Sequence, residues 1–376
     1  MVVASVHGKV PSNRPVMALL GDTVTLYAVA VVGRGASTRY YSDAPSLTLR
    51  NRRISRRKIR PLAQLGSVRF GWYQVEPQPH HVETAPPNAG NPAYSNAILF
   101  GARHGRWLGY DTLEYIRRPI RHAIQRATGS TLKVKRTFPS HAKVDVNAGL
   151  GTMRYGVELR TATYSLTSEN SPDTVARGIS SSVMRVSFRS GNDLVGYLGA
   201  YFNVPNVFGS AGGIGRGHQT DRFQGADCAD VIIGAARQAG LDLPYTSVSA
   251  LHRYARPVSV LLRLTHSGIY YVEGSEKGKR ADLPLGSAIR RGDIMLINYE
   301  GFAGSPRAWD HVAVVGAAKT TRGSFSGKTP ILHMGYLYGL TRTAAQNEGP
   351  AVIQFLRLKK KYQRRLAHLQ RKNRRP

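Results

Sequence analysis

The chain has 376 residues, of which 41% are hydrophobic and 9% aromatic, so it can form real cores and wholesale disorder is excluded. Domains usually contain roughly 100–200 residues, so this length predicts two domains and excludes a single small module. The 53 basic and 22 acidic residues give a net charge of +31, which favours anionic partners without selecting one. The single cysteine, Cys228, excludes an intramolecular disulfide and any zinc site that needs two thiolates.

Residues 16–190 contain short runs of β-branched and aromatic residues separated by Gly, Pro, Asn and Ser, which is typical of an all-β domain. We therefore expect a β-rich, sandwich-like domain over residues 1–190. The segments expected to form its strands are Thr23–Val32, Ser67–Val75, Thr131–Arg136, Met153–Leu166 and Val183–Phe188. A short helix is predicted over Pro119–Ala127, because a first helical turn tolerates proline, and the proline-rich segment Gln78–Pro92 is predicted to be a loop.

The pattern changes near Asn192, where helical periodicity joins the strand-like runs, so we expect an α+β domain over residues 191–358. Its clearest helix is predicted over Cys228–Ala239, with apolar residues on one face and Gly240 at the C-terminal cap. A shorter helix is expected over Asp193–Phe202. The strands expected after the main helix are Val258–Leu264, Ile269–Val272, Ile294–Asn298, His311–Val315, Ile331–Met334 and Val352–Leu358.

Cys228 lies in the first turn of the predicted main helix, within the segment Asp227-Cys228-Ala229-Asp230. Unpaired backbone N–H groups and the positive end of the helix dipole favour a thiolate there, so we expect a lowered pKa for this thiol. A free cysteine is also commonly a small buried residue without chemistry. Its position makes Cys228 a candidate nucleophile. Whether it is a nucleophile or a small buried residue depends on which residues surround it.

A thiolate nucleophile needs an imidazole base, and that imidazole needs a polar group that fixes its orientation. His311 begins one predicted strand and His333 lies within the next. If these strands pair as antiparallel neighbours, both histidines can lie on the same face of the sheet. A metal site built from His218, Asp221, His311 and His333 lacks close ligand spacing, so we predict neither a metal nor another cofactor.

Four segments resemble the NlpC-type papain-like cysteine peptidases and amidases, many of which cut bacterial cell-wall peptides. The segments are Asp227-Cys228 at the helix start, Arg291-Gly292-Asp293-Ile294 before a strand, His311-Val312-Ala313-Val314, and Ile331-Leu332-His333. The resemblance covers about Tyr197–Leu358 and implies a papain-like α+β domain. It implies Cys228 as nucleophile, His311 as general base and His333 as the group that orients it. Asp293 is expected to hold the turn before its strand.

The chain departs from the family pattern beside the nucleophile. Ala229-Asp230 follows the cysteine where family members usually have Ser-Gly, and the aromatic hydroxyl that often precedes the site is missing. Gln219 is therefore our candidate for the side-chain donor of the oxyanion hole, with the backbone N–H of Cys228 as the second donor.

The resemblance implies hydrolysis of a peptide or peptidoglycan-fragment substrate through an acyl-enzyme on Cys228, and the same thioester would also serve acyl transfer. An alternative from a different class is a non-catalytic protein that binds a polyanion or the cell wall and carries a degenerate papain-like domain.

Two basic clusters suggest an anionic polymer as a partner. Arg50–Arg60 contains seven Lys or Arg residues, and the chain from Arg357 onward contains ten and no acid. We predict that residues 359–376 of this basic segment form a disordered tail. Neither cluster has the interleaved aromatic residues that stack single-stranded bases, so we predict no specific nucleic-acid recognition.

No segment has the roughly 20 apolar residues that a membrane span needs, and we expect none. Met1–Pro15 lacks the basic start and apolar middle of a signal peptide. The location is therefore open, with the cell envelope or the extracellular space expected if the N-terminus is incomplete.

Overall fold

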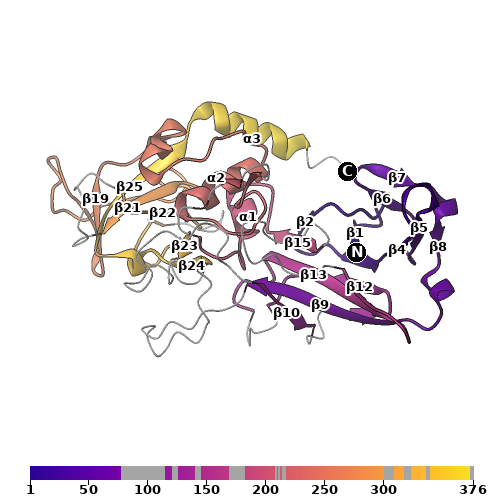
Figure 1. Cartoon of the computed structure of the whole chain (residues 1–376). Coiled ribbons are helices and arrows are strands. Elements are labelled where there is room, and N and C mark those ends of the chain that lie inside the picture. Colours follow the sequence, from indigo (N-terminus) through magenta and orange to yellow (C-terminus); the bar gives the residue numbers. More distant parts are fainter. Residues whose placement is uncertain are drawn as a thin grey trace. The chain divides into compact units, whose positions relative to one another are not determined.

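The computed structural model describes residues 1–77, 115–120, 126–139, 145–168, 183–207, 210, 212–213, 217–299, 309–316, 323–335 and 339–372. These residues form a mixed α+β structure of open sheets with few helices (Figure 1). The chain divides into two compact units, Met1–Ser190 and Gly191–Pro376, each of which has its own sheets. Among the described helices, none combines the length and the apolar character needed to cross a membrane.

The main core of the N-terminal unit is shared by two sheets. Their strands are β1 (Val2–Val6), β2 (Val16–Leu19), β3 (Val24–Ala28), β9 (Arg69–Pro77), β10 (Tyr115–Pro119), β11 (Arg126–Thr128), β12 (Thr131–Val134), β13 (Gly151–Arg160), β14 (Ser165–Thr167) and β15 (Met184–Arg189). One sheet has the order β1-β3-β12-β11, and the other has the order β10-β9-β13-β15-β2 with β14 paired to β13. Leu26 and Leu132 of the first sheet and Tyr155 and Phe188 of the second are fully buried in one common cluster.

Short strands complete the N-terminal unit. They are β4 (Ala30–Val32), β5 (Arg39–Tyr41) and β8 (Ile59–Arg60) in one small sheet, and β6 (Leu47–Leu49) and β7 (Arg52–Ile54) in a hairpin. Most of the Arg50–Arg60 basic cluster is exposed, including the 3-10 turn Arg56–Lys58 between β7 and β8. This cluster is therefore displayed on short, ordered elements.

The structure corrects one element that we expected in this unit. The helix predicted over Pro119–Ala127 is wrong at both ends, because Pro119 ends β10 and Arg126 begins β11. Proline suits a first helical turn, but it is equally compatible with an edge strand, where its missing N–H breaks no ladder, and β10 is the edge of its sheet. Residues 121–125 of this prediction, and the loop predicted over Gln78–Pro92, lie outside the described residues.

The C-terminal unit is built around one antiparallel sheet. Its elements are α1 (Leu194–Gly199), β16 (Gly212–Gly213), β17 (Gly217–His218), α2 (Cys228–Gln238), β18 (Ala255–Pro257), β19 (Leu262–Thr265), β20 (Gly268–Tyr271), β21 (Ile294–Tyr299), β22 (His311–Val315), β23 (Pro330–Gly335), β24 (Gly339–Ala344), β25 (Ala351–Leu358) and α3 (Lys360–Lys372). The sheet order is β20-β19-β25-β21-β22-β23-β24, and β18 also pairs with β25 (Figure 1).

Helix α2 is defined by its two ends and its apolar face. The Asp227 carboxylate accepts hydrogen bonds from the backbone N–H groups of Ala229 at 3.0 Å and Asp230 at 2.8 Å, which is a regular N-terminal cap. Gly240 ends the helix with a φ of +94°, a conformation that favours glycine. The buried face of α2 packs against α1 and against strands β22 and β23.

The disordered tail that we expected is wrong for residues 360–372, which form α3. The charge of this segment suggested disorder, but Tyr362, Leu366 and Leu369 recur at helical spacing on one face. Leu366 is buried, the Tyr362 ring packs edge-on against Tyr254 with centroids 6.1 Å apart, and Leu369 lies where a side chain at position 240 would stand. These contacts offset the entropy of ordering the helix.

Candidate functional site

The register of the sheet brings the two predicted histidines together. Strands β22 and β23 are antiparallel neighbours, and Ala313 pairs with His333. His311 is two residues before Ala313 and therefore lies on the same face of the sheet. The expected pairing of these strands is confirmed, and it places two imidazole rings side by side.

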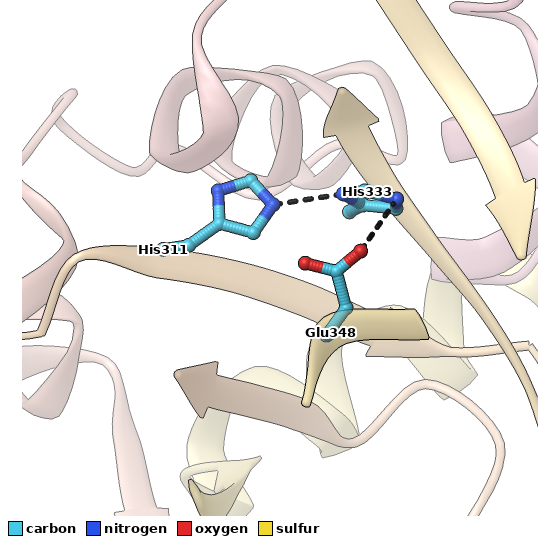
Figure 2. A group of neighbouring side chains, drawn as sticks. All are labelled: His311, His333 and Glu348. Carbon is cyan, nitrogen blue, oxygen red and sulfur yellow. Dashed lines mark hydrogen bonds and ion pairs between the residues drawn. The ribbon is translucent and has the colours of Figure 1, made fainter. Parts of the chain in front are cut away.

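The two imidazoles and a glutamate lie in series, joined by one hydrogen bond and one ion-pair contact (Figure 2). The Nε2 atom of His311 lies 2.8 Å from Nδ1 of His333. The other ring nitrogen of His333, Nε2, lies 3.4 Å from Oε1 of Glu348 and 3.1 Å from the hydroxyl oxygen of Thr341. Glu348 belongs to the 3-10 turn Ala345–Glu348, which connects β24 to β25. His333 thus stands between His311 and a nearly buried carboxylate.

Tyr299, the last residue of β21, contacts both ends of this series. Its hydroxyl donates a hydrogen bond to Oε2 of Glu348, and its ring stacks with that of His311 at a centroid distance of 6.2 Å. Burial raises the pKa of the Tyr299 hydroxyl well above its ordinary range, and the charges of Glu348 and Cys228 raise it further. This hydroxyl therefore remains protonated and acts as a donor.

Cys228 is the first residue of α2, and it is only half-buried as a residue. Burial of the thiol nevertheless raises its pKa to about 12, the Asp227 charge adds to this effect, and the N–H groups of Cys228 and Ala229 oppose it. The lowered pKa that we expected from the helix start is therefore wrong. The helix amides act in the expected direction, but desolvation and two neighbouring carboxylates outweigh them.

Both histidines are held neutral by the same desolvation. Burial lowers the pKa of His311 to about 3, with a further contribution from His333. Burial also lowers the pKa of His333, while the charge of Glu348 acts in the opposite direction. A neutral thiol and neutral imidazoles are consistent with general-base chemistry, in which the proton moves only as the nucleophile attacks.

The structure places Cys228 next to the strands of the histidines without a hydrogen bond to them. Helix α2 packs against β22 and β23, and a charge on Cys228 affects the Tyr299 hydroxyl. Among the described residues, no hydrogen bond joins the Cys228 thiol to His311. Catalytic hydrogen bonds are often long before substrate binds, so this arrangement is compatible with a nucleophile and its base.

Gln219 lies in the turn after β17 and is 3% exposed. Its carbonyl oxygen accepts hydrogen bonds from the backbone N–H groups of Arg222 at 3.1 Å and Gln224 at 3.0 Å. Within the described part of the chain, its side chain makes no hydrogen bond with the Cys228 thiol. Its assignment to an oxyanion hole stays a prediction.

His218 and Asp221, which we considered as metal ligands, belong to contacts different from those of His311 and His333. The Nε2 atom of His218 lies 3.5 Å from Oδ2 of Asp230, which also accepts a hydrogen bond from the Ser210 hydroxyl at 2.5 Å. Asp221 accepts hydrogen bonds from Arg237 at 3.1 Å and Tyr245 at 2.8 Å. These polar groups are satisfied by one another.

Among the described residues, the group with spacing suitable for a cation is His311, His333 and Glu348, whose candidate ligand atoms lie within 4.8 Å of one another. Two ligands of a tetrahedral zinc ion, each about 2.1 Å from the metal, would stand roughly 3.4 Å apart. The 2.8 Å between the imidazole nitrogens is instead a hydrogen-bond distance. Glu348 also approaches the second nitrogen of His333, so the three residues are paired in series.

Asp293 holds the start of β21. Its carboxylate accepts the backbone N–H of Arg290 at 2.7 Å and two guanidinium N–H groups of Arg357 at 2.8 and 2.7 Å. It is 2% exposed, so these charge-assisted bonds are shielded from water. This carboxylate connects the turn before β21 to the end of β25.

Comparison of the chain with family models, with curated proteins and with solved structures found no match. The NlpC-type resemblance therefore remains an expectation that rests on the four sequence segments.

The sequence analysis missed Glu348, Thr341 and Tyr299. One signal for Glu348 was available, because it is the only acid among residues 311–376. An isolated carboxylate in so basic a segment, close in sequence to two candidate histidines, is a reasonable partner for them. No comparable signal marks Thr341 or Tyr299, whose positions depend on the strand register.

Proposed function

We propose that the C-terminal unit is a papain-like, NlpC-type cysteine hydrolase that cleaves amide bonds through an acyl-enzyme on Cys228. The observation that supports this best is the series His311, His333 and Glu348, carried by strands and a turn beside the helix that begins with Cys228. A nucleophile, a base and a group that orients the base are the minimum set for such chemistry.

In the proposed reaction, the Cys228 sulfur attacks the carbonyl carbon while His311 accepts the thiol proton. His311 then gives that proton to the leaving amine as the C–N bond breaks, which leaves a thioester on Cys228. A water molecule, deprotonated by His311, attacks the thioester and releases the acid and the thiol. His333 keeps the His311 ring in position throughout, through the 2.8 Å hydrogen bond between them.

The substrate that we propose is a peptide or peptidoglycan fragment. This choice follows the sequence resemblance, and the same thioester would also support transfer to an amine. The alternative is a non-catalytic protein that binds an anionic wall polymer through its net charge of +31.

Digestion of purified wall fragments tests the proposal, with new termini read by mass spectrometry. We expect cleavage by the wild-type protein and a loss of at least roughly a thousandfold in turnover for Cys228→Ala, because the covalent route disappears. Circular dichroism should show that the variant is folded. An active Cys228→Ala protein would overturn the mechanism, and activity that chelators abolish would point to a cation at His311, His333 and Glu348.

A further inference from the structure

The polar contacts around Glu348 favour one arrangement of the protons on the two histidines. Tyr299 donates to Oε2 of Glu348, and the other oxygen, Oε1, lies 3.4 Å from Nε2 of His333. A carboxylate has only acceptors, so its approach favours the tautomer of His333 that carries the proton on Nε2. Thr341 supports this, because its hydroxyl, directed at the His333 carbonyl, leaves its oxygen free to accept at 3.1 Å.

The tautomer of His333 determines that of His311. A neutral His333 protonated at Nε2 has a lone pair at Nδ1 and can only accept there. The 2.8 Å contact therefore requires a proton on Nε2 of His311, which leaves the lone pair of His311 on Nδ1. Nδ1 of His311 is thus prepared to accept a proton, and the buried Glu348 carboxylate favours this arrangement through His333.

We infer that Glu348 is a positioning residue that fixes the tautomers of His333 and His311, with Tyr299 holding its carboxylate in place. The role in hydrolysis rests on the proposed function, whereas the tautomers do not. When His311 accepts a proton, the negative charge of Glu348 also stabilises the positive charge through His333. The contacts among Tyr299, His311, His333 and Glu348 thereby form one unit, assembled from β21, β22, β23 and the turn before β25.

Glu348→Gln provides the sharpest test, because the glutamine amide can donate its N–H to Nε2 of His333. That contact favours the opposite tautomer of His333, with its proton on Nδ1. His311 then keeps the 2.8 Å contact by accepting at Nε2 and carrying its own proton on Nδ1, which removes the lone pair prepared for the thiol proton. We expect turnover to fall by roughly a hundredfold or more, as when the carboxylate of a catalytic triad is replaced by its amide. The acid limb of the pH profile should also move, because the charge that stabilises protonated His311 is lost.

Two further variants separate positioning from folding. Glu348→Asp keeps the charge and should recover part of the activity, and Tyr299→Phe should cost less than Glu348→Gln because the carboxylate remains. Glu276→Gln is the matched control, since this exposed glutamate pairs only with Lys279 at the surface. It should leave turnover and pH profile unchanged.

Imidazole nitrogen NMR reads the tautomers without any substrate. We expect wild-type His333 and His311 to carry their protons on Nε2, and Glu348→Gln to change the His333 signals in a folded protein. A wild-type His333 protonated on Nδ1, or tautomers that ignore Glu348→Gln, would overturn the inference. If the tautomers behave as expected and wall fragments stay intact, the proposed hydrolysis fails while the positioning of the histidines stands.

Discussion

At Cys228, three local effects compete for the proton of the thiol. The N–H groups at the start of α2 favour the thiolate, while burial and the Asp227 and Asp230 carboxylates favour the thiol. The Asp227 carboxylate, which caps the helix, therefore also opposes ionisation of Cys228, the first residue of the helix. The same residue stabilises the helix and favours the neutral form of the thiol that we propose as nucleophile.

Asp227→Asn separates these two effects, because asparagine caps a helix nearly as well as aspartate but carries no charge. We expect the thiol pKa to fall and alkylation by iodoacetamide at neutral pH to accelerate, with the melting temperature little changed. Wild-type Cys228 should react more slowly than free cysteine. Asp242→Asn, at an exposed carboxylate, is the control and should leave the rate unchanged. A wild-type thiol more reactive than free cysteine near pH 6 would contradict this account.

Asp230 makes stability depend on pH. Burial raises its pKa to about 8, and the charge of Asp227 contributes. The folded protein therefore keeps a proton that the unfolded chain releases above its ordinary pKa of about 4, so stability is present at low pH and is lost as pH rises toward 8. Burial lowers the pKa of its neighbour His218 to about 4. That histidine therefore lowers the free energy of unfolding only below its ordinary pKa of about 6.5.

Asp230→Asn removes this titration while keeping an acceptor for the Ser210 hydroxyl. We expect the wild-type melting temperature to fall between pH 6.5 and 8.5 and that of the variant to change less. The wild-type slope is at most about 1.4 kcal/mol per pH unit, the value for one proton. Parallel curves for the two proteins would show that Asp230 is ionised in the fold.

Sequence reasoning reached the part of the site that depends on local patterns. His311 and His333 begin or lie within strongly apolar strands, and Cys228 precedes an amphipathic helix with a recognisable cap. Glu348 was missed because it reaches His333 only through the register of β23, β24 and β25, which the sequence does not display. The thiol pKa was misjudged because its largest cause, burial, is a property of the folded unit.

At the scale of elements, α3 has two chemically distinct faces. At about 100° per residue, Lys360, Lys361, Arg364, Arg365 and Arg371 fall within an arc of roughly 140°, and all are exposed. The opposite side carries Tyr362, Leu366 and Leu369, which contact the C-terminal unit. The ordered helix therefore presents its positive charges in one direction, which a flexible tail would not do.

Neutralising four of these charges tests their role without removing the packed face. We expect Lys360→Gln, Lys361→Gln, Arg364→Gln and Arg365→Gln together to weaken binding to anionic wall polymer, most strongly at low salt. Glutamine has a helix propensity close to that of lysine and arginine, so the melting temperature should hold. The matched control replaces four exposed arginines of the N-terminal cluster: Arg52→Gln, Arg53→Gln, Arg56→Gln and Arg57→Gln. Loss of small-peptide turnover in the α3 variant would instead connect α3 to the site.

Elements with strong periodicity were predictable, and those determined by neighbours were not. The strand expected over His311–Val315 is β22, and the helix expected from Cys228 is α2, one residue shorter than predicted. The unpredicted strand β24 (Gly339–Ala344) contains Gly, Thr and Arg and owes its conformation to pairing with β23. The high positive charge of residues 360–372 favoured a prediction of disorder. The packing of Tyr362, Leu366 and Leu369, which stabilises α3, is seen only in the folded unit.

At the scale of the whole molecule, the chain combines a β-rich unit with a unit in which a few helices accompany one antiparallel sheet, and their boundary lies between Ser190 and Gly191. Positive charge is spread over both units, on the Arg50–Arg60 cluster and on α3. The apolar cores are separate, because the main clusters draw on residues of one unit or the other. The proposed site residues and these two basic clusters thus lie in different parts of the chain.

The position of β25 has a consequence for synthesis. Among the described strands of its sheet, β25 comes last in sequence, yet it lies in the interior of that sheet, between β19 and β21, and also pairs with β18. A ribosome must therefore release the chain through Leu358 before the sheet can close, and until then β19 and β21 each lack this neighbour. Such late, long-range pairing slows folding and exposes strands to aggregation. Premature termination before residue 351 would leave the sheet without its interior strand.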